Sequence, residues 1–347
     1  MTPRTMRAVM YHAPKTIRLE EVTVPKPGPN EVLLKIGAAL TCGTDFKAFR
    51  QGHSVLLGSL PAPFGHEFSG TVAAVGEGIT QFSPGTRVVA ANSAPCDGCF
   101  HCDRDENQLC ENMKLLNGAY AEYLLLPANI VKRNTYAIDE GTSFETAALS
   151  EPFSCAIHAV DATGVRKGDT VAVIGAGIMA RFLLEALKAK GASTIMIGRS
   201  PEPLAMMKRL DANETISALD QDPVEAVRKL TGGHGADCVF EAVGKGETWN
   251  QAIQMTRKGG KVCLFGGCKQ GTEVPVDAHR IHYGQLSLYG VFHHKPRYFE
   301  KALQLLSTGL ISTEGLIEGS IGLGEVPNFF EERQDRSNLK SAVLPHA

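Results

Sequence analysis

The chain lacks a marked excess of charge of either sign, and it lacks a long hydrophobic run. Lys and Arg together number 35, against 37 Asp and Glu, which gives a net charge of -2 over 347 residues. A chain without a basic excess is not typical of proteins that bind nucleic acid. No window approaches the roughly 18 consecutive apolar residues that a membrane-spanning helix needs. We therefore expect a small-molecule partner, and neither nucleic acid nor a membrane.

The N-terminal segment lacks the pattern of a signal peptide, because residues 1–21 contain no apolar core followed by small residues. We therefore expect a cytoplasmic protein. Its nine cysteines would stay reduced there, so metal ligation explains them better than disulfides do. The 43% of hydrophobic residues is typical of a globular protein and excludes disorder or a coiled coil. A chain of this length favours two domains of roughly 150 residues each.

The pattern of hydrophobic residues changes near residue 150. Before it, short apolar runs such as 31–36 and 70–75 are separated by proline and glycine, which is typical of a β-rich domain. After it, short apolar strands alternate with helical stretches, which predicts a parallel sheet with helices on both faces. The expected strands are 170–174, 194–197, 237–240 and 261–265, and the expected helices are 178–190, 204–210, 223–230, 248–255 and 298–306. This predicts an α/β fold with a β-rich domain at 1–150, a doubly wound domain at 151–290, and a segment at 291–347 that returns to the first domain.

Four cysteines form a cluster within fifteen residues, namely Cys96, Cys99, Cys102 and Cys110. Zinc prefers a tetrahedron of thiolates, and closely spaced cysteines on tight turns can surround one ion. Two disulfides or unrelated thiols are the alternative, which the lack of an export signal disfavours. Four thiolates leave no open coordination position, so the expected site is structural. Cys238 and Cys263 lie inside expected strands, where a thiol acts as a small buried hydrophobe.

A second group of metal-ligand residues is spread over three segments. Cys42 and Asp45 fall in one turn, His66 and Glu67 fall in another, and Glu151 lies where the chain passes into the second domain. One thiolate, one imidazole and one or two carboxylates can hold zinc and leave room for water or substrate. Each residue alone is weak evidence, because a lone histidine is more often a core or surface residue. Glu151 could instead cap the helix that follows.

A glycine-rich turn follows the strand at 170–174 and precedes the helix at 178–190. It reads Gly175-Ala-Gly177-Ile178-Met179-Ala180, which is G-x-G-x-x-A between a strand and a helix. The first glycine permits the tight turn, the second lets the backbone approach a pyrophosphate, and the third small residue lets helix and strand pack. The phosphates would rest on the helix N-terminus. This motif predicts dinucleotide binding.

The end of the next strand predicts which dinucleotide. An NAD site expects Asp or Glu about 20 residues after the glycine turn, to accept hydrogen bonds from the ribose 2′-OH. Here the strand ends in Gly198-Arg199-Ser200. Glycine removes the carboxylate that would repel a 2′-phosphate, and Arg199 and Ser200 can donate hydrogen bonds to that phosphate. We expect NADP with NAD possible, the alternative being that Arg199 is a solvated loop residue.

Together these motifs resemble the zinc-dependent medium-chain dehydrogenase/reductase family, the alcohol and polyol dehydrogenases, over nearly the whole chain. Gly65-His-Glu67-x2-Gly70-x5-Gly76 is similar to the zinc signature of that family, and the four-cysteine cluster matches its structural zinc. The resemblance implies a GroES-like β-rich catalytic domain with a Rossmann domain. It also implies two zinc ions, one catalytic and one structural.

The resemblance assigns roles to individual residues. It makes Cys42 and His66 ligands of the catalytic zinc, with Glu67 as a ligand or a neighbour of the metal, and Glu151 as the polyol-type ligand. Thr44 matches the residue that relays a proton from the substrate alcohol. The residues expected to line the nicotinamide are Ala242, Val243, Phe265 and Gly266. A histidine pair such as His293-His294 is more often a surface or interface feature than part of a site.

The expected function is a zinc-dependent oxidoreductase that transfers hydride between NADP(H) and a secondary alcohol, polyol or sugar. We expect a homo-oligomer, a dimer or tetramer. Three alternatives remain: an NAD-dependent polyol or hydroxy-amino-acid dehydrogenase of the same family, a zinc-free quinone or enone reductase, and a non-catalytic nucleotide-sensing protein. The two alternatives that lack zinc chemistry would not need the full set of ligands together with Thr44.

Overall fold

The structure is a computed structural model that describes residues 2–333 and 339–347. The chain folds into two units, residues 1–154 with 294–347, and residues 155–293. Helix α5 (Ser150–Thr163) begins in the first unit and continues into the second. The C-terminal segment thus belongs to the same unit as the N-terminal one.

The first unit is rich in β-strands. Its strands are β1 (Thr5–Ala13), β2 (Thr16–Thr23), β3 (Val32–Leu40), β4 (Ala62–Pro63), β5 (Glu67–Val75), β6 (Arg87–Ala90), β7 (Ser93–Ala94), β8 (Lys114–Leu115), β9 (Tyr123–Leu126), β10 (Thr135–Ala137), β17 (Ile317–Gly322) and β18 (Lys340–Leu344). Its helices are α1 (Gly43–Gln51), α2 (Ser54–Leu57), α3 (Ala128–Arg133), α4 (Phe144–Ala148), α11 (Pro296–Ser307) and α12 (Val326–Glu332), with short 3-10 turns at Cys102–Arg104, Asn107–Leu109 and Leu323–Glu325.

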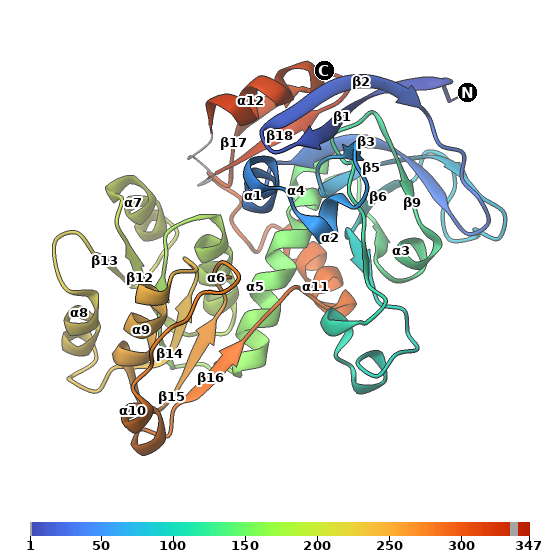
Figure 1. Ribbon diagram of the computed structural model, residues 1–347. Helices are drawn as coiled ribbons and strands as arrows, with labels where there is room; N and C mark the ends of the chain where they lie inside the picture. Colours follow the sequence, from blue (N-terminus) through green and yellow to red (C-terminus); the bar gives the residue numbers. More distant parts are fainter. Residues whose placement is uncertain (1, 334–338) are drawn as a thin grey trace. The chain divides into compact units, whose positions relative to one another are not determined.

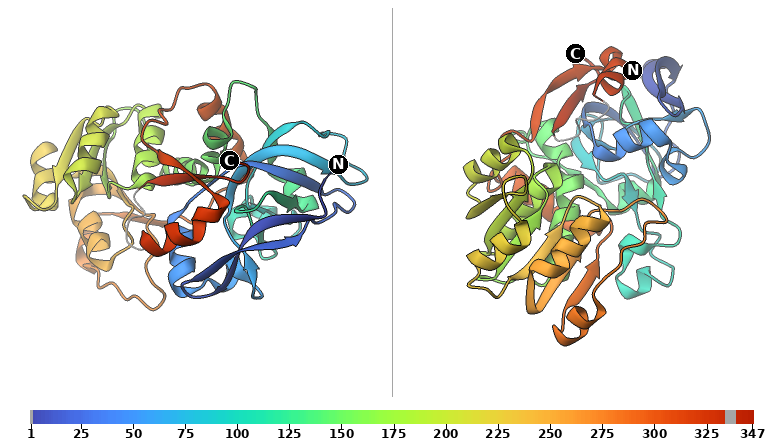
Figure 2. Two further views of the ribbon diagram at one scale, coloured as in Figure 1. Left: turned by 90° about the horizontal axis from the view of Figure 1, so that it is seen from above. Right: turned by 60° about the vertical axis from the view of Figure 1, so that its left-hand side comes forward.

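The main sheet of this unit joins both ends of the chain. Among the described residues its order is β10-β6-β5-β3-β18-β17, with β9 also paired to β3. Figure 2 shows the C-terminal strands in red beside the N-terminal ones in blue, and β18 pairs antiparallel with β3. Buried aromatic rings fill the core, with Phe330 packed on Phe46 at 4.5 Å and on Phe64 at 5.5 Å between ring centroids. Each fully buried ring contributes about 1.5–3 kcal/mol to the free energy of unfolding, because folding removes it from water.

The second unit is a parallel sheet with helices on both faces. Its strands are β11 (Thr170–Ile174), β12 (Ser193–Gly198), β13 (Glu214–Ser217), β14 (Ala236–Glu241), β15 (Thr256–Leu264) and β16 (Ser287–Gly290). Its helices after α5 are α6 (Ile178–Ala189), α7 (Pro201–Arg209), α8 (Pro223–Leu230), α9 (Gly246–Met255) and α10 (Ala278–Tyr283). In residues 155–293, all of which are described, the strand order is β13-β12-β11-β14-β15-β16. Helices α6 and α7 cover one face and α8 and α9 the other, as right-handed crossovers require (Figure 1).

This architecture confirms the α/β fold class, with a β-rich unit and a doubly wound parallel sheet. Strands β13 and β16 were missed because they are the edges of the sheet. Each has four residues, of which at most one is buried, so neither carries a continuous apolar run. Helix α10 was also missed, because its six residues bury no side chain and show no apolar stripe.

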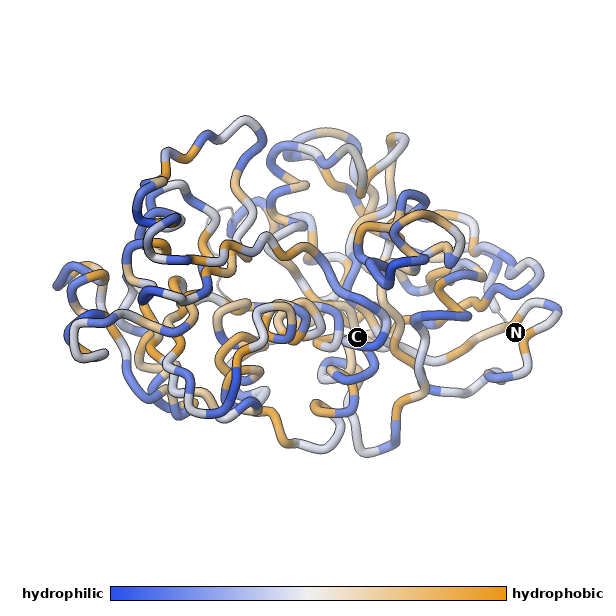
Figure 3. Tube along the Cα trace, turned by 90° about the horizontal axis from the view of Figure 1, so that it is seen from below, coloured by the Kyte–Doolittle hydropathy of each residue, from blue (hydrophilic) through white to orange (hydrophobic). Residues whose placement is uncertain are grey.

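Hydrophobic segments are short throughout the described chain. Figure 3 shows apolar stretches in orange alternating with polar stretches in blue along the trace. None of the helices in residues 2–333 and 339–347 combines the length and the apolar character that crossing a membrane requires.

Candidate active site

Strand pairing in the first unit brings two of the sequence motifs together. Cys42 directly precedes α1, and Glu67 begins β5, which pairs antiparallel with β3 so that Leu40 faces Glu67. As a result the Cys42 thiol, the His66 ring and the Glu67 carboxylate present ligand atoms within 4.8 Å of one another. His66 and Glu67 are buried, whereas Cys42 is partly exposed. This mixed set of soft and hard donors suits zinc with an open position.

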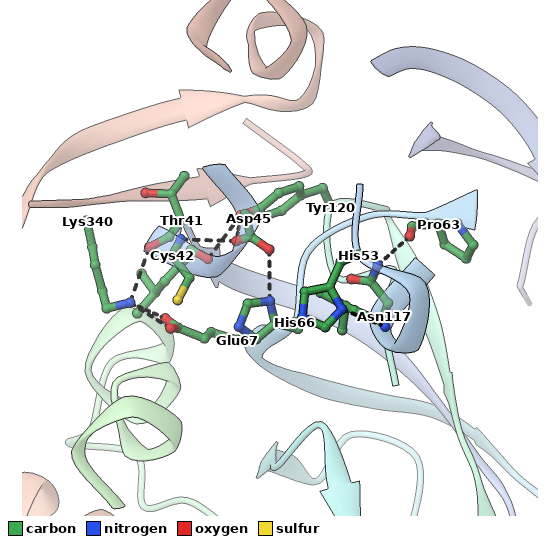
Figure 4. A network of polar contacts seen from close by, with 12 residues as sticks. Thr41, Cys42, Asp45, His53, Pro63, His66, Glu67, Asn117, Tyr120 and Lys340 are labelled. Carbon is green, nitrogen blue, oxygen red and sulfur yellow. Dashed lines mark hydrogen bonds and ion pairs between the residues drawn. The ribbon is translucent and has the colours of Figure 1, made fainter. Parts of the chain in front are cut away.

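One carboxylate, that of Asp45, connects the first two of these residues (Figure 4). Its Oδ1 lies 2.8 Å from His66 Nδ1, and its Oδ2 accepts the backbone N–H of Cys42 at 3.0 Å. The hydroxyl of Tyr120 donates to the same Oδ2 at 2.6 Å. With Nδ1 engaged by Asp45, Nε2 is the nitrogen that His66 can offer to a metal. Burial alone would lower the pKa of His66, but the charge of Asp45 and its hydrogen bond outweigh burial and hold the pKa well above its usual value.

Glu67 is paired with a buried lysine from the far end of the chain. Lys340 at the start of β18 donates to both carboxylate oxygens, at 2.7 and 2.6 Å, and to the carbonyl of Thr41 at 3.2 Å. Both charged side chains are almost completely buried, at 2% and 0% exposure. Burial opposes the charge of Lys340, but the carboxylate of Glu67 prevails and raises its pKa. The pair therefore holds the Glu67 carboxylate in place beside the thiol.

Lys340→Met should lower the free energy of unfolding by about 3–5 kcal/mol, because it leaves the Glu67 charge buried without a partner. The loss is measured by urea unfolding of chelator-treated protein, in which no metal compensates the carboxylate. The double variant with Glu67→Gln should recover much of the loss, and the exposed Lys35→Met serves as the control. A loss below about 1 kcal/mol, the range of exposed pairs, would contradict the pairing.

Glu151 groups with a histidine rather than with the first three residues. It lies in the first turn of α5, and its carboxylate is 3.9 Å from Nε2 of His294. His294 is 2% exposed, so the expectation of a surface position for this histidine is wrong. Burial, followed by the charge of Glu67, raises the pKa of Glu151 to about 7. Thr44 lies half-buried in the first turn of α1, two positions after Cys42.

The four cysteines of the cluster come together as a second group of ligands. The sulfur atoms of Cys96, Cys99, Cys102 and Cys110 lie within 4.8 Å of one another. All nine cysteines, each at a described position, are free thiols. The amide of Asn112 donates to Cys96 Sγ at 3.5 Å, and this hydrogen bond helps to lower the pKa of that thiol to about 6. Burial raises the pKa of the Cys110 thiol to about 12, so the thiols of the group differ in how readily they ionise. The set of four sulfur donors fits a structural zinc.

In the second unit the glycine-rich turn has the geometry that its motif predicts. Gly175 has a φ of +123°, and a Cβ there would lie 3.4 Å from the carbonyl oxygen of Ala242. Helix α6 starts directly after Gly177, which provides no side-chain cap. The N–H groups of the first turn of α6 therefore have no intrahelical partners; this turn contains Ile178, Met179 and Ala180. Free N–H groups at a helix N-terminus are what phosphate binding requires.

Glu241 braces the loops expected at the nicotinamide end. Its buried carboxylate accepts the N–H groups of Val243 at 2.8 Å and Gly244 at 2.9 Å, and the Thr248 hydroxyl at 2.8 Å. A Cβ on Gly266 would lie 2.4 Å from the Gly244 nitrogen, so glycine is required for this close approach. The ends of β14 and β15, which carry Ala242, Val243, Phe265 and Gly266, are thereby held together.

The end of β12 leaves its cationic side chain available. Arg199 and Ser200 are both exposed. Gly198 is buried, and a Cβ there would lie 2.8 Å from the Cβ of Ala176. Glycine at this position therefore serves the packing of β12 against the glycine-rich turn, as well as leaving no carboxylate for a ribose.

Two residues of the site escaped sequence reasoning. Lys340 could have been noticed as a single cation at the start of the apolar run 342–344, but its partner lies at the opposite end of the chain. Tyr120 gives no signal, because an aromatic residue between apolar neighbours is typical of a core position. Asp45 belongs to the same turn as Cys42 in the sequence, three positions later. That its carboxylate contacts His66, Cys42 and Tyr120 is evident only from the fold.

Comparison with known proteins identifies the family of this chain. Residues 28–135 match the model of the alcohol dehydrogenase GroES-like domain, and residues 165–308 match that of zinc-binding dehydrogenases. The sorbitol dehydrogenase of Bacillus subtilis (strain 168) is 30% identical over 99% of this chain and 98% of its own length. The chain belongs to the zinc-dependent medium-chain alcohol and polyol dehydrogenase family. The members of this family are oxidoreductases. The family expected from the sequence is therefore confirmed.

Two further proteins are similar to this chain. The L-threonine 3-dehydrogenase of Bacillus velezensis is 31% identical over 94% of this chain and 95% of its own length. A solved structure of a zinc-binding dehydrogenase from Sinorhizobium meliloti 1021, bound to NADP, superposes with a TM-score of 0.92 at 28% identity, covering 99% of this chain and 100% of the other. The two curated relatives are named for different compounds, sorbitol in one case and L-threonine in the other.

Proposed function

We propose that this protein is a zinc-dependent dehydrogenase that interconverts a secondary alcohol, polyol or sugar with its carbonyl form, with NADP(H) as the preferred cofactor. The observation that carries the proposal is the convergence of Cys42, His66 and Glu67 to within 4.8 Å in a chain of this family. A zinc-free reductase or a nucleotide sensor of the same fold would gain nothing from these ligands, or from the second group of four thiols.

The residues of the site divide the work of the reaction. Cys42 and His66 would hold the catalytic zinc, with Glu67 or Glu151 as a further ligand or neighbour. When bound, zinc supplies Lewis acidity to the alcohol oxygen and the nicotinamide supplies the hydride acceptor. Asp45 keeps His66 oriented, and Lys340 keeps the Glu67 carboxylate in place. Thr44, at the start of α1, would pass the hydroxyl proton outward.

The proposed substrate class follows from Glu151 and from the relatives. Glu151 resembles the polyol-type residue of the family, and the sorbitol dehydrogenase relative is named for a polyol. A cofactor-reduction assay over secondary alcohols, sugar alcohols and aldoses should find activity within this panel. Activity confined to primary alcohols such as ethanol would contradict the proposed class.

A second candidate is an NAD-dependent hydroxy-amino-acid dehydrogenase, favoured by the 31% identity with an L-threonine 3-dehydrogenase. Both candidates share the chemistry at Cys42 and His66 and differ in substrate and cofactor. Including L-threonine and related hydroxy amino acids in the same panel, with each cofactor, separates them.

The preference for NADP(H) rests on Arg199, which is exposed at the end of β12. A charge-assisted hydrogen bond to the 2′-phosphate contributes about 1.5–3 kcal/mol, and 1.4 kcal/mol is about tenfold in affinity. We therefore expect at least about a tenfold preference for NADP(H). Arg199→Leu should abolish most of this preference, because it should raise the KM for NADP(H) and leave the KM for NAD(H) unchanged. Because Gly198 has no room for a Cβ, the test leaves that residue unchanged.

Steady-state kinetics with both cofactors measure this effect. Arg209→Leu removes an equal charge from the exposed end of α7 and serves as the control. Equal or better kinetics with NAD(H) in the unmodified enzyme would overturn the assignment and leave Arg199 as a solvated loop residue.

A further inference from the structure

Tyr120 is a fully buried residue whose hydroxyl contacts Asp45, the carboxylate that contacts both Cys42 and His66. Its side chain is 0% exposed, and its hydroxyl lies 2.6 Å from Asp45 Oδ2 and 3.2 Å from the carbonyl oxygen of Leu40. Asp45 is also 0% exposed. Burial, and then the charge of Asp45, raises the pKa of Tyr120 well above its usual value, so the hydroxyl keeps its proton. The phenol is therefore a permanent donor to a buried carboxylate.

The backbone holds Tyr120 rigidly against the turn that carries His66. The N–H of Tyr120 donates to the carbonyl of Phe64 at 2.9 Å, and the N–H groups of Gly118 and Ala119 both donate to the carbonyl of Gly65, at 2.7 and 2.9 Å. Gly65 has a φ of +90°, and a Cβ there would lie 2.6 Å from the Tyr120 ring. The glycine that precedes His66 thus allows both the turn and the close approach of the ring.

The contact with Tyr120 is the third that holds the Asp45 carboxylate. Its Oδ1 faces His66 and its Oδ2 faces the backbone of Cys42, so both metal-ligand residues depend on one orientation of one carboxylate. A second donor on Oδ2 fixes that orientation, because turning the carboxylate would leave the buried hydroxyl without its charged acceptor. Tyr120 thereby acts on two ligands through Asp45.

We propose that Tyr120 is a positioning residue of the catalytic metal site, whose hydroxyl locks Asp45 so that His66 and Cys42 are preorganised to retain zinc. The proposal rests on the proposed function, in that it requires zinc at Cys42 and His66. Outer contacts of this kind commonly change metal affinity by about 10–100-fold when they are removed. The expected consequence concerns retention of the metal and not the stability of the fold.

The chain offers a matched control in Tyr11. Tyr11 is 1% exposed, belongs to the same hydrophobic core and packs on Phe64 at 5.9 Å between ring centroids, where Tyr120 packs on it at 5.8 Å. Its hydroxyl has no hydrogen-bond partner within the part of the chain that the structure describes. Tyr11→Phe and Tyr120→Phe therefore remove the same atom from the same core, and only the second removes a contact to Asp45.

The test compares the two variants as zinc-loaded, folded proteins. Zinc release to a chromogenic chelator under native conditions should show a fast phase from the Cys42 and His66 site and a slow phase from the four-cysteine cluster. Tyr120→Phe should accelerate the fast phase about tenfold or more and leave the slow phase unchanged. Tyr11→Phe should leave both phases unchanged. With Co²⁺ in place of zinc, the ligand-field spectrum of the first site should change in Tyr120→Phe only.

Each outcome separates the two proposals. Wild-type release kinetics and an unchanged Co²⁺ spectrum in Tyr120→Phe would overturn the positioning role. Equal acceleration in both variants would do the same, because it would show a general effect of loosening the core. If Cys42→Ser removes no phase of zinc release, zinc does not bind at Cys42 and His66. That result would overturn the proposed function, and with it the role of Tyr120. Thermal unfolding of every variant identifies any that has lost its fold, and Asp45→Asn then tests the same lock from its acceptor side.

Discussion

His66→Ala should lower turnover by about a thousandfold or more, because Lewis-acid stabilisation is worth several kcal/mol and each 1.4 kcal/mol is about tenfold in rate. The variant removes one of the two proposed ligands that contact Asp45, His66 being buried and Cys42 partly exposed. The four-cysteine cluster is formed by residues 96–110 and does not involve His66. The variant should therefore remain folded and retain one of two zinc ions per chain.

Elemental analysis and steady-state kinetics on the same preparation check this result. His282→Ala removes a histidine from the exposed surface of α10 and should change neither zinc content nor turnover. Turnover in His66→Ala within about tenfold of the unmodified enzyme would contradict a metal-ligand role, since a factor of ten corresponds to only about 1.4 kcal/mol.

Cys99→Ser should produce the opposite combination of effects. The segment 96–110 contains only short 3-10 turns, and its apolar side chains Phe100 and Leu109 are exposed, so burial contributes little to its order. Structural zinc contributes apparent binding energies of about 10–16 kcal/mol in isolated zinc-finger peptides. Losing one thiolate should therefore unfold this segment locally and accelerate proteolytic cleavage within it by about a hundredfold or more.

The segment 96–110 also forms ion pairs with another part of the first unit, so its local unfolding should affect that part as well. Asp105 pairs with Lys295 at 3.1 Å and with Arg297, both at the start of α11. Cys99→Ser should thus lose one zinc ion and weaken folding or assembly. Cys238→Ser removes a buried thiol of β14 and should leave zinc content unchanged. Cleavage at the unmodified rate in a Cys99→Ser protein that has lost its zinc would contradict a structural role for the metal.

Local patterns in the sequence were sufficient to predict the second unit. The strand at 170–174 and the helix from 178 lie where their hydrophobic pattern placed them, because the parallel sheet buries its central strands on both faces. The glycine turn between them could be recognised because its chemistry depends on adjacent residues. The edge strands β13 and β16 and the short helix α10 escaped, since elements that stay largely at the surface need no apolar run.

Of the candidate site, only the residues proposed as metal ligands could be predicted. Cys42 and His66 stand in recognisable motifs, but their partners are set by the pairing of β3 with β5 and with β18. That pairing places Lys340 beside Glu67, although the two lie at opposite ends of the chain. Glu151 and His294 come together in the same way, through long-range packing that neither local sequence encodes. Contacts of this kind depend on tertiary structure and leave no local pattern.

The most direct test is a cofactor-reduction assay with the panel of secondary alcohols, polyols and hydroxy amino acids, run on the unmodified enzyme before and after selective removal of its faster-released zinc. We expect NADP⁺-linked oxidation of a secondary alcohol or polyol by protein that holds about two zinc ions per chain. That activity should disappear when the ion at Cys42 and His66 is removed and return when zinc is restored. Undiminished turnover by protein that retains only the zinc of the four-cysteine cluster would contradict a zinc-dependent dehydrogenase.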